Sequence, residues 1–308
     1  MPLCFGGDDK EPEDEYDSIP FSLRWRIRFS KKETDPNTGE TVLRLSSNKI
    51  LKTQCANTEY QALKLIDRNT SVPTYKVLAV YNRPEGKWVE YEACPGKPLQ
   101  DVWPNMAAHQ RNKVVIDIGR FVEQLRKMQP PKLCVVGDAT LGAALDKRFG
   151  SGKVGPFYSI AAFHDFERRG HPPHDFPEKE IQSVHDPKKE YELKFTHANL
   201  CPKNVLVDDA GRITALIGWE SSGWYPEYWE YTQMCHLTPK TMGDWLDAMR
   251  NVLPRYDQEL ACEEALRSHY CGSIYDAPRS IRAQSPSPSQ LLADQRDIED
   301  KNTESTSG

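Results

Sequence analysis

The stretch from Phe195 to Glu220, FTHANLCPKNVLVDDAGRITALIGWE, constrains the fold more than any other part of the chain. Two short apolar segments flank an Asp-Asp-Ala-Gly turn at residues 208–211, and this pattern predicts a β-hairpin. A polar loop with His197 and Asn204 comes before the hairpin, and a Trp ends it. This layout is typical of a loop that carries active-site side chains on a rigid support.

Length, charge and cysteine usage exclude several classes of protein. The chain of 308 residues is long enough for a sizeable core and two lobes. A net charge of −5 argues against a nucleic-acid partner, because phosphate backbones require a basic face. The chain has neither an apolar run of about 18 residues nor a signal peptide, so we expect no membrane partner. Eight cysteines without a CxxC pair indicate reduced, mostly buried thiols in a cytoplasmic protein.

Both ends of the chain have the composition of solvated segments. Residues 1–19 include DDKEPEDEYD, which holds seven acids and one Lys, and residues 277–308 are polar and rich in Ser and Pro. Such segments cannot bury enough apolar surface to fold alone, so we expect both to be disordered. Contact with a protein partner is one role for them. Ser285 and Ser287 precede prolines and are candidate phosphorylation sites, although a plain tail is the simpler interpretation.

Residues 20–96 are expected to form a small β-rich lobe with one helix. PFSLRWRIRF predicts a strand, a turn with Pro36 follows, and TVLRLSSNKILK predicts a hairpin with residues 46–48 at its tip. NTEYQALKLIDRNT predicts a helix with an Asn or Thr cap and with Tyr60 on its apolar face. TYKVLAVYN and KWVEYEA predict two further strands.

After Cys94-Pro95-Gly96 the pattern becomes helical. Residues 105–128 keep apolar side chains in helical register, and further helices are predicted at 158–169 and near 240–270. This larger lobe, residues 97–276, contains the hairpin stretch 195–220. The expected fold class is therefore α+β, with a small β-rich lobe joined to a larger helical lobe.

Several motifs together resemble the aminoglycoside phosphotransferase and choline kinase family, in its filamentous-fungal branch. The motifs are ILK, EYQALKLIDRNTSVPTYKV, YEACPG, LGAALDKRFG, HANLCPKN and VDDAGRITALIGWESSGWYPEYWEY. The resemblance covers about residues 41–270 and implies a two-lobed protein-kinase-like fold. It also implies ATP as the candidate nucleotide and a small hydroxyl- or amine-bearing molecule as the second ligand.

The resemblance assigns nucleotide-binding roles to four residues. Lys52 would pair with nucleotide phosphates, and Glu59 would hold Lys52 by a charge-assisted bond. Glu92 and Cys94 lie in the linker that would contact adenine through backbone groups. From position alone, an exposed strand Lys and a Glu that stabilises a helix dipole are the simpler interpretation of the first two.

Two carboxylates of the family pattern are replaced at the centre of the site. The family loop reads H-G/A-D-L-x-P-x-N, and its Asp takes the proton from the substrate hydroxyl. This chain has Asn199 there, and an amide cannot accept that proton at neutral pH. The second Asp, in IDWE, binds magnesium, and its position is Gly218. Asn204 remains but is a weak neutral ligand, so efficient magnesium-dependent transfer is not expected.

Few neighbouring groups could replace the lost carboxylates. Asp208 and Asp209 belong to the hairpin turn and should point away from the site. Glu220 would face the same side as Gly218 on a regular strand, which makes it a candidate metal ligand, whereas a pairing inside the core is the simpler interpretation. His197 and Asn199 are the candidate catalytic positions, with His197 expected to be a hydrogen-bonded core residue.

Two other groups of residues suggest different chemistry. His171 and His174 lie three residues apart on a Pro-containing loop without an evident third ligand, so a zinc site is not expected. Cys201 lies four residues after His197, and the two could form a nucleophile and base pair.

Four functions remain open from the sequence. The leading one is a pseudo-phosphotransferase that binds a nucleotide or a small ligand with little or no kinase activity. The others are a weakly active ATP-dependent O-phosphotransferase, a non-phosphoryl enzyme of a biosynthetic pathway and a kinase-fold scaffold.

Overall fold

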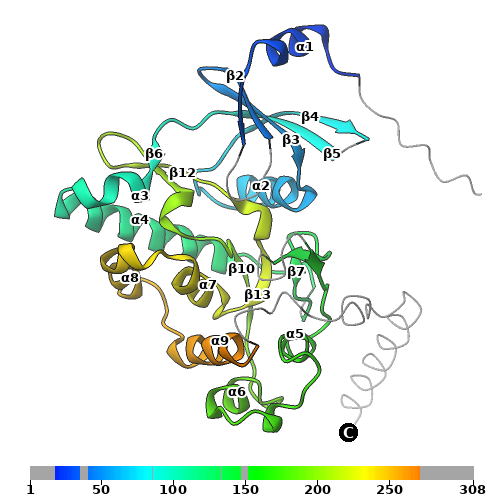
Figure 1. The fold of residues 1–308 in the computed structure, drawn as a ribbon, viewed down its shortest axis with the longest axis vertical. Helices are drawn as coiled ribbons and strands as arrows, with labels where there is room; N and C mark the ends of the chain where they lie inside the picture. Colours follow the sequence, from blue (N-terminus) through cyan, green and yellow to red (C-terminus); the bar gives the residue numbers. More distant parts are fainter. Residues whose placement is uncertain (1–17, 35–40, 85, 133, 147–151, 271–308) are drawn as a thin grey trace, which may run out of the picture.

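The computed structural model describes residues 18–34, 41–84, 86–132, 134–146 and 152–270. The acidic start of the chain, the predicted turn at Pro36 and the Ser/Pro-rich tail lie outside these ranges. Within them, a β-sheet lobe stands at one end of the long axis and a larger helical lobe forms the rest (Figure 1). The two-lobed α+β architecture expected from the sequence is confirmed.

The N-terminal lobe contains a five-stranded sheet in the order β1-β2-β3-β5-β4. The strands are β1 (Lys31–Thr34), β2 (Thr41–Ser46), β3 (Lys49–Cys55), β4 (Val77–Arg83) and β5 (Gly86–Glu92). β2 and β3 form the predicted hairpin, because Ser46 pairs with Lys49 across its tip. β4 and β5 are the two strands predicted after the helix, and they pair antiparallel.

The segment predicted as the first strand is a helix, α1 (Phe21–Arg28). Pro20 precedes it as the N-cap residue, and Leu23 and Ile27 pack together against the sheet. These two side chains are four residues apart, so PFSLRWRIRF satisfies a helical spacing as well as an alternating one. The strand prediction was wrong because the short segment fits both periods.

The helix α2 (Asn57–Asn69) lies where it was predicted, with Leu63 and Ile66 buried in the main core. Its N-cap residue is Ala56, which makes no side-chain cap hydrogen bond. Thr58 instead donates its hydroxyl to the backbone oxygen of Glu220, at 2.9 Å, and so links this helix to the C-terminal lobe. The predicted Asn or Thr cap was therefore wrong.

The C-terminal lobe is built on α4 (Ala108–Lys127), which lies within the predicted span 105–128. The other helices are α3 (Leu99–Val102), α5 (Ile160–Glu167), α6 (Lys179–Val184), α7 (Trp229–Leu237), α8 (Gly243–Arg250) and α9 (Asp257–His269). Of these, α5, α8 and α9 were predicted, whereas α7 begins inside the aromatic run, where no helix was expected. None of the described helices has both the length and the apolar character that crossing a bilayer requires.

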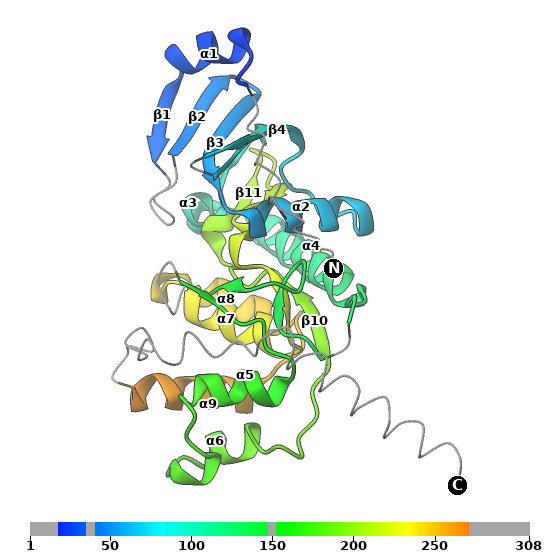
Figure 2. The ribbon, with the colours of Figure 1, turned by 90° about the vertical axis from the view of Figure 1, so that its right-hand side faces the viewer.

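Short strands connect the helices and form the centre of the site. They are β6 (Lys97–Pro98), β7 (Gly137–Asp138), β8 (Ala144–Leu145), β9 (Lys153–Val154), β10 (Leu193–Thr196), β11 (Val205–Val207), β12 (Ile213–Leu216) and β13 (Gly223–Pro226). β11 and β12 form the predicted hairpin, which lies at the level of α2 between the two lobes (Figure 2). Two 3-10 turns, η4 (Pro202–Asn204) and η5 (Trp219–Ser221), flank the hairpin, and η5 packs against α2.

Candidate functional site

Lys52 and Glu59 form a buried ion pair between β3 and α2. Lys52 Nζ lies 2.9 Å from Glu59 Oε1 and 3.0 Å from Oε2. The two side chains are 7% and 0% exposed, which excludes the interpretation of Lys52 as an exposed strand residue. Burying two charges costs free energy, and the close contact between them offsets this cost. The ion pair links the first turn of α2 to strand β3 of the sheet.

Two side chains that the sequence analysis missed surround this pair. Cys55 Sγ lies 3.6 Å from Glu59 Oε2 and 3.2 Å from Tyr91 Oη. The side chains of Cys55, Glu59 and Tyr91 are all buried. The position of Cys55 in the sequence, three residues after Lys52 and four before Glu59, could have indicated its contact with this pair.

His197 braces the polar loop from inside. Its backbone N–H donates to Glu230 Oε2 at 2.7 Å, and its ring Nδ1 accepts from the backbone N–H of Asn199 at 3.2 Å. Ring Nε2 lies 3.1 Å from the carbonyl oxygen of Ile217. Since a carbonyl only accepts, Nε2 carries the proton and the ring is neutral. Both ring nitrogens are committed, so the ring has none left to serve as a base for Cys201, which is itself fully buried.

Asn199 directs its amide nitrogen into the protein. Nδ2 donates to the backbone oxygen of Gly218 at 3.2 Å and to Glu220 Oε1 at 3.1 Å. Oδ1 is buried and has no hydrogen-bond partner among the residues that the structure describes. An amide oxygen can accept a hydrogen bond but cannot remove a proton from a hydroxyl group, and this one is not exposed to a ligand in the structure.

Position 218 is closed by neighbouring amides. Gly218 has a φ of +81°, and a Cβ on it would lie 2.9 Å from Asn204 Nδ2 and 3.1 Å from Asn199 Nδ2. Asn204 Nδ2 is itself held by the backbone oxygen of Asn199 at 2.7 Å. The space that a longer side chain at this position would enter is thus occupied by two hydrogen-bonded amide groups.

Glu220 lies in the 3-10 turn η5 and not on a strand, so the regular-strand geometry predicted for it was wrong. β12 ends at Leu216, and Gly218, in the left-handed conformation, starts the turn. The carboxylate of Glu220 nevertheless reaches the loop, since it accepts from Asn199, and it is 3% exposed. The carboxylate is thus buried and paired with an amide of the polar loop.

These side chains do not fit a magnesium centre. Magnesium binds several hard oxygen ligands in octahedral geometry. The carboxylate in contact with the Asn199 side chain is that of Glu220, and its Oε1 already accepts from Asn199 Nδ2. Gly218 provides no side chain, and the amide nitrogens of Asn199 and Asn204 fill the adjoining space.

Glu230 on α7 anchors the backbone of the loop, a role that the sequence analysis missed. Its two carboxylate oxygens accept from the N–H groups of His197 and Ala198, at 2.7 Å and 3.3 Å. Ala198 has a φ of +58°, so the loop needs this support to keep a strained backbone. Burial raises the pKa of Glu230 to about 7, and the two backbone donors oppose the rise.

The linker between the lobes commits part of its backbone to the protein. The N–H of Glu92 donates to the oxygen of Lys76 and that of Ala93 to the oxygen of Asn48, both at 2.9 Å. Cys94 Sγ lies 3.8 Å from the oxygen of Thr74, and burial raises the pKa of this thiol to about 11. Adenine recognition in the linker would therefore depend on backbone groups other than these two N–H groups.

The remaining candidate positions lie outside this site. Asp208 accepts from the backbone N–H groups of Ala210 and Arg212 in the hairpin turn, and the Asp209 side chain is 96% exposed. The His174 side chain is 82% exposed and lies beside Asp175. Within the described ranges, His171 and His174 belong to no group of side chains spaced to hold a metal ion.

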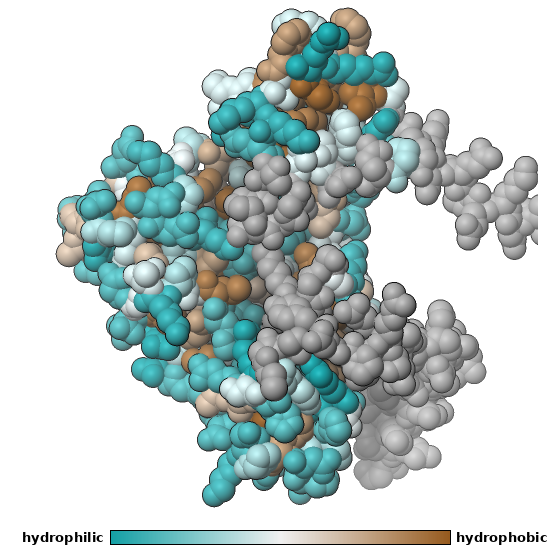
Figure 3. Space-filling view, viewed as in Figure 1, coloured by the Kyte–Doolittle hydropathy of each residue, from teal (hydrophilic) through white to brown (hydrophobic). Residues whose placement is uncertain are grey.

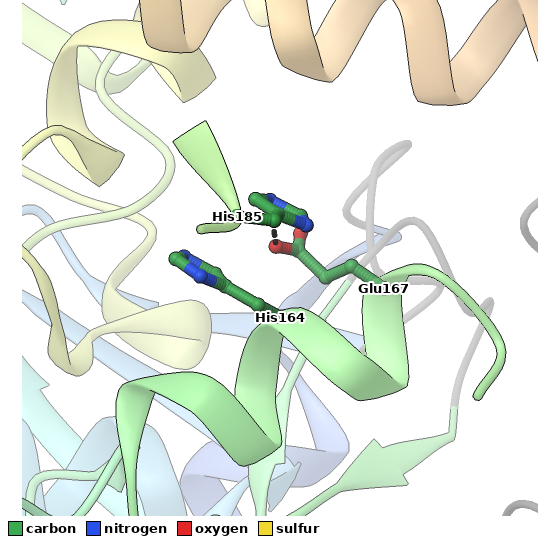
Figure 4. A group of neighbouring side chains, drawn as sticks. All are labelled: His164, Glu167 and His185. Carbon is green, nitrogen blue, oxygen red and sulfur yellow. Dashed lines mark ion pairs between the residues drawn. The ribbon is translucent and has the colours of Figure 1, made fainter. Parts of the chain in front are cut away.

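A separate buried group of ligand-type side chains, His164, Glu167 and His185, lies in the helical lobe (Figure 4). One ligand atom of each lies within 4.8 Å of the others. Arg168 Nη1 is 2.9 Å from His185 Nδ1, and because a guanidinium only donates, His185 carries its proton on Nε2. That nitrogen faces Glu167 Oε2 at 3.7 Å, so it offers no lone pair to a metal.

The arrangement of the two imidazole rings also argues against a metal site. The rings of His164 and His185 are stacked, with centroids 4.0 Å apart and planes 3° apart. Their in-plane lone pairs therefore run side by side and do not converge on one ion. Burial lowers the pKa of His164 to about 3 and that of His185 well below its usual value. Both imidazole rings are therefore neutral, and the group forms a buried polar network in the lobe.

The sheet lobe, the buried Lys-Glu pair and the braced polar loop define a phosphotransferase-like protein of kinase-like fold. Residues 28–261 match the model of the phosphotransferase enzyme family APH, and the chain belongs to this family. The family resemblance stated from the sequence is thereby confirmed. Among curated proteins, none matches the chain.

Solved aminoglycoside phosphotransferases share the fold. The GDP complex of an aminoglycoside 2′-phosphotransferase-IIIa mutant has a TM-score of 0.53 at 14% identity, over 83% of this chain and 90% of that chain. A thermostable mutant of APH(4)-Ia with ADP and hygromycin B has a TM-score of 0.53 at 15% identity, over 84% and 94%. ADP-bound APH(2″)-Ib has a TM-score of 0.50 at 8% identity, over 89% and 92%. Similarity at these identities shows the fold alone.

Proposed function

We propose that the chain is a pseudo-phosphotransferase, which binds a nucleotide and a small hydroxyl- or amine-bearing ligand with little or no phosphoryl transfer. The observation that carries the proposal is a contrast within one site. The Lys52–Glu59 pair is assembled at 2.9 Å, whereas the amides of Asn199 and Asn204 fill the space at Gly218. Nucleotides in the similar structures, GDP in one and ADP in two, support ATP as the candidate ligand.

Each residue then has a limited role. Lys52 would contact the nucleotide phosphates, and Glu59 would keep its side chain extended toward them. Asn199 would hold the loop through Nδ2, and its Oδ1 would orient the hydroxyl of the second ligand only after the loop shifts to uncover this buried atom. The missing base alone removes roughly 10²–10⁴ of rate.

An ATP titration by calorimetry, with and without magnesium, tests the proposal. We expect binding that is similar in both conditions and is lost in Lys52→Ala. Lys49→Ala is the matched control, because Lys49 lies on the same strand and pairs with Glu90 at 3.0 Å outside the site. Binding that requires magnesium, or ATP turnover at ordinary kinase rates, would reject the pseudoenzyme.

The position of Glu220 supports a second candidate function, a weakly active O-phosphotransferase. This carboxylate touches Asn199 at the centre of the loop and could compensate in part for the lost acids. Slow ADP formation that disappears in Glu220→Gln would favour this alternative. The geometry gives less support to a nucleophilic role of Cys201, since the thiol is buried and the ring of His197 is committed.

A cytoplasmic location suits the proposal. The six cysteines that the structure describes form no disulfide, as in a reducing compartment. Protein partners of the two tails are a separate proposal, which pull-downs with and without residues 277–308 would test.

A further inference from the structure

The outer face of α1 exposes a row of aromatic side chains. Phe21, Trp25 and Phe29 are 82%, 61% and 68% exposed, and they follow one another at intervals of four residues. The rings of Trp25 and Phe29 touch, with centroids 5.0 Å apart. Because large side chains at this spacing lie along one face of a helix, they form a continuous apolar ridge and are not scattered surface residues.

The opposite face of α1 already holds the helix on the protein. Leu23 is fully buried and packs with Ile27 against the sheet, and Arg26 pairs with Glu90 at 3.2 Å. The aromatic ridge is therefore not needed to attach the helix. Its exposure calls for a partner outside the described part of the chain.

The aromatic ridge carries positive charge at its sides. Arg24 and Arg28 on α1 are exposed, and the described residues provide no ion-pair partner for either of them. The whole chain has a net charge of −5, so this cluster of cations runs against the overall balance. Figure 3 shows the apolar and hydrophilic side chains next to each other over α1, at the end of the molecule.

Charge and shape indicate which kind of partner would cover the outer face of α1. A second copy of the chain would bring its own arginines against these arginines. α1 lies at the tip of the sheet lobe, away from the helical lobe (Figure 1). Its exposed rings form a ridge rather than a groove. Aromatic rings flanked by arginines on such a ridge match a flat anionic surface, with rings at the apolar boundary and guanidinium groups at phosphates.

We propose that α1 docks onto an anionic lipid surface through Phe21, Trp25 and Phe29, with Arg24 and Arg28 contacting lipid phosphates. This proposal differs from the expectation of no membrane partner, which was based on the lack of a spanning segment and of a signal peptide in the sequence. Residues 8–17 carry seven acids and are repelled by the same lipids. The binding is therefore weak, salt-dependent and specific for membranes with a high anionic content.

Co-sedimentation of the full chain with lipid vesicles tests this proposal. We expect sedimentation with vesicles of phosphatidylcholine that contain about a third phosphatidylserine, and none with phosphatidylcholine alone. Raising sodium chloride from about 0.1 M to about 0.5 M should release the protein. Trp25→Ala with Phe29→Ala should abolish binding, and Arg24→Gln with Arg28→Gln should weaken it by about 20-fold or more, at about fivefold per cation.

The control variant combines Ile116→Ala with Arg120→Gln, an exposed apolar residue and an exposed cation on α4. It should sediment like the unchanged chain, and thermal unfolding should show that all variants are folded. ATP binding should be unaffected in each of them, because α1 contributes no residue to the candidate site. Failure to sediment with anionic vesicles, or equal loss in the control, would overturn the proposal. The first of these results would assign the face to an acidic protein partner instead.

Discussion

Asn199 Nδ2 donates to Glu220 Oε1 at 3.1 Å, and this contact joins the polar loop to the turn that follows the hairpin. Both side chains are buried, with 1% and 3% exposure. An amide at position 199 can donate to the carboxylate, whereas a second carboxylate would repel it. In this chain Asn199 therefore gives Glu220 a hydrogen bond that an Asp at position 199 could not donate.

Asn199→Asp should destabilise the protein without creating a phosphotransferase. The new carboxylate loses the donors to Gly218 and Glu220 and faces a like charge, at a cost of roughly 2–4 kcal/mol of unfolding free energy. Because two close carboxylates share one proton, the pKa of the pair is raised, and the variant should regain stability as the pH falls. Denaturant unfolding at several pH values measures this change.

Glu220→Gln is the second arm of this experiment. The double variant, Asn199→Asp with Glu220→Gln, no longer places two carboxylates side by side. We expect its loss of unfolding free energy to be smaller than the sum of the two single losses by roughly 1–2 kcal/mol. Additive effects of the two substitutions would contradict the contact between these side chains.

Gly218→Ala separates the steric role of this glycine from its backbone conformation. Its Cβ would lie 2.9 Å from Asn204 Nδ2, at a φ of +81°. Gly170 is the matched control, because its φ is +80° and nothing lies within 4 Å of the position that a Cβ would take there. We expect Gly170→Ala to cost about 1 kcal/mol, from the positive φ alone, and Gly218→Ala roughly 2–4 kcal/mol.

Thermal or denaturant unfolding gives both values. Equal costs at the two positions would show that Asn204 moves aside freely. In that case Gly218→Asp becomes a fair test of restored magnesium-dependent activity, whereas a large difference means that a failed restoration has a steric cause.

The sequence predicted most of the elements because their apolar periodicity was long or their turns were distinctive. α2 and α4 have several buried positions at helical spacing, and the β11–β12 hairpin has an Asp-Asp-Ala-Gly turn. α1 was mistaken for a strand because eight residues satisfy both periods. α7 was missed because almost all of its side chains are buried, so its sequence shows no polar face.

The candidate site was predictable in part. Lys52 and Glu59 could be paired through the family resemblance, since a strand followed by a helix brings these positions together. Glu230 and Cys55 could not be assigned, because their roles depend on tertiary contacts with His197 and Glu59 that no local pattern encodes. The left-handed Gly218 likewise turned Glu220 off the strand that was expected to present it.

Stability should depend on pH through Glu230. Its folded-state pKa of about 7 lies above the ordinary value of 4.5, because burial disfavours the charged form. The folded protein then holds the proton more tightly than the unfolded chain. The stabilising contribution is complete below about pH 4.5 and is lost as the pH rises through about 7, by at most about 3 kcal/mol.

Glu230→Gln should flatten this part of the stability profile between about pH 5 and 7.5. Glu123→Gln is the control, since Glu123 is exposed and its pKa is lowered by Lys127, so it should keep the slope of the unchanged protein. Urea unfolding across the pH range provides the comparison. An unchanged slope in Glu230→Gln would assign the pH dependence to other groups.

The hydrogen bond from Thr58 to the backbone oxygen of Glu220 should couple the two lobes. Thr58→Val removes the hydroxyl that donates to the buried carbonyl of Glu220. The loss of this donor should lower the free energy of unfolding by about 1–3 kcal/mol. Because Thr58 precedes Glu59, the loss should also loosen the first turn of α2 and weaken ATP binding severalfold. Hydrogen exchange should show faster exchange in this turn and in residues 219–221.

Thr70→Val provides the comparison at the other end of α2. Thr70 donates to the oxygen of Ile66 at 2.9 Å, so it loses a bond of similar length within one lobe. We expect faster exchange only near the C-terminus of the helix and unchanged ATP affinity. If Thr58→Val and Thr70→Val affect exchange at residues 219–221 equally, the bond between Thr58 and Glu220 does not couple the lobes. A loss confined to Thr58→Val would identify this contact as the link between the Lys52–Glu59 pair and the polar loop.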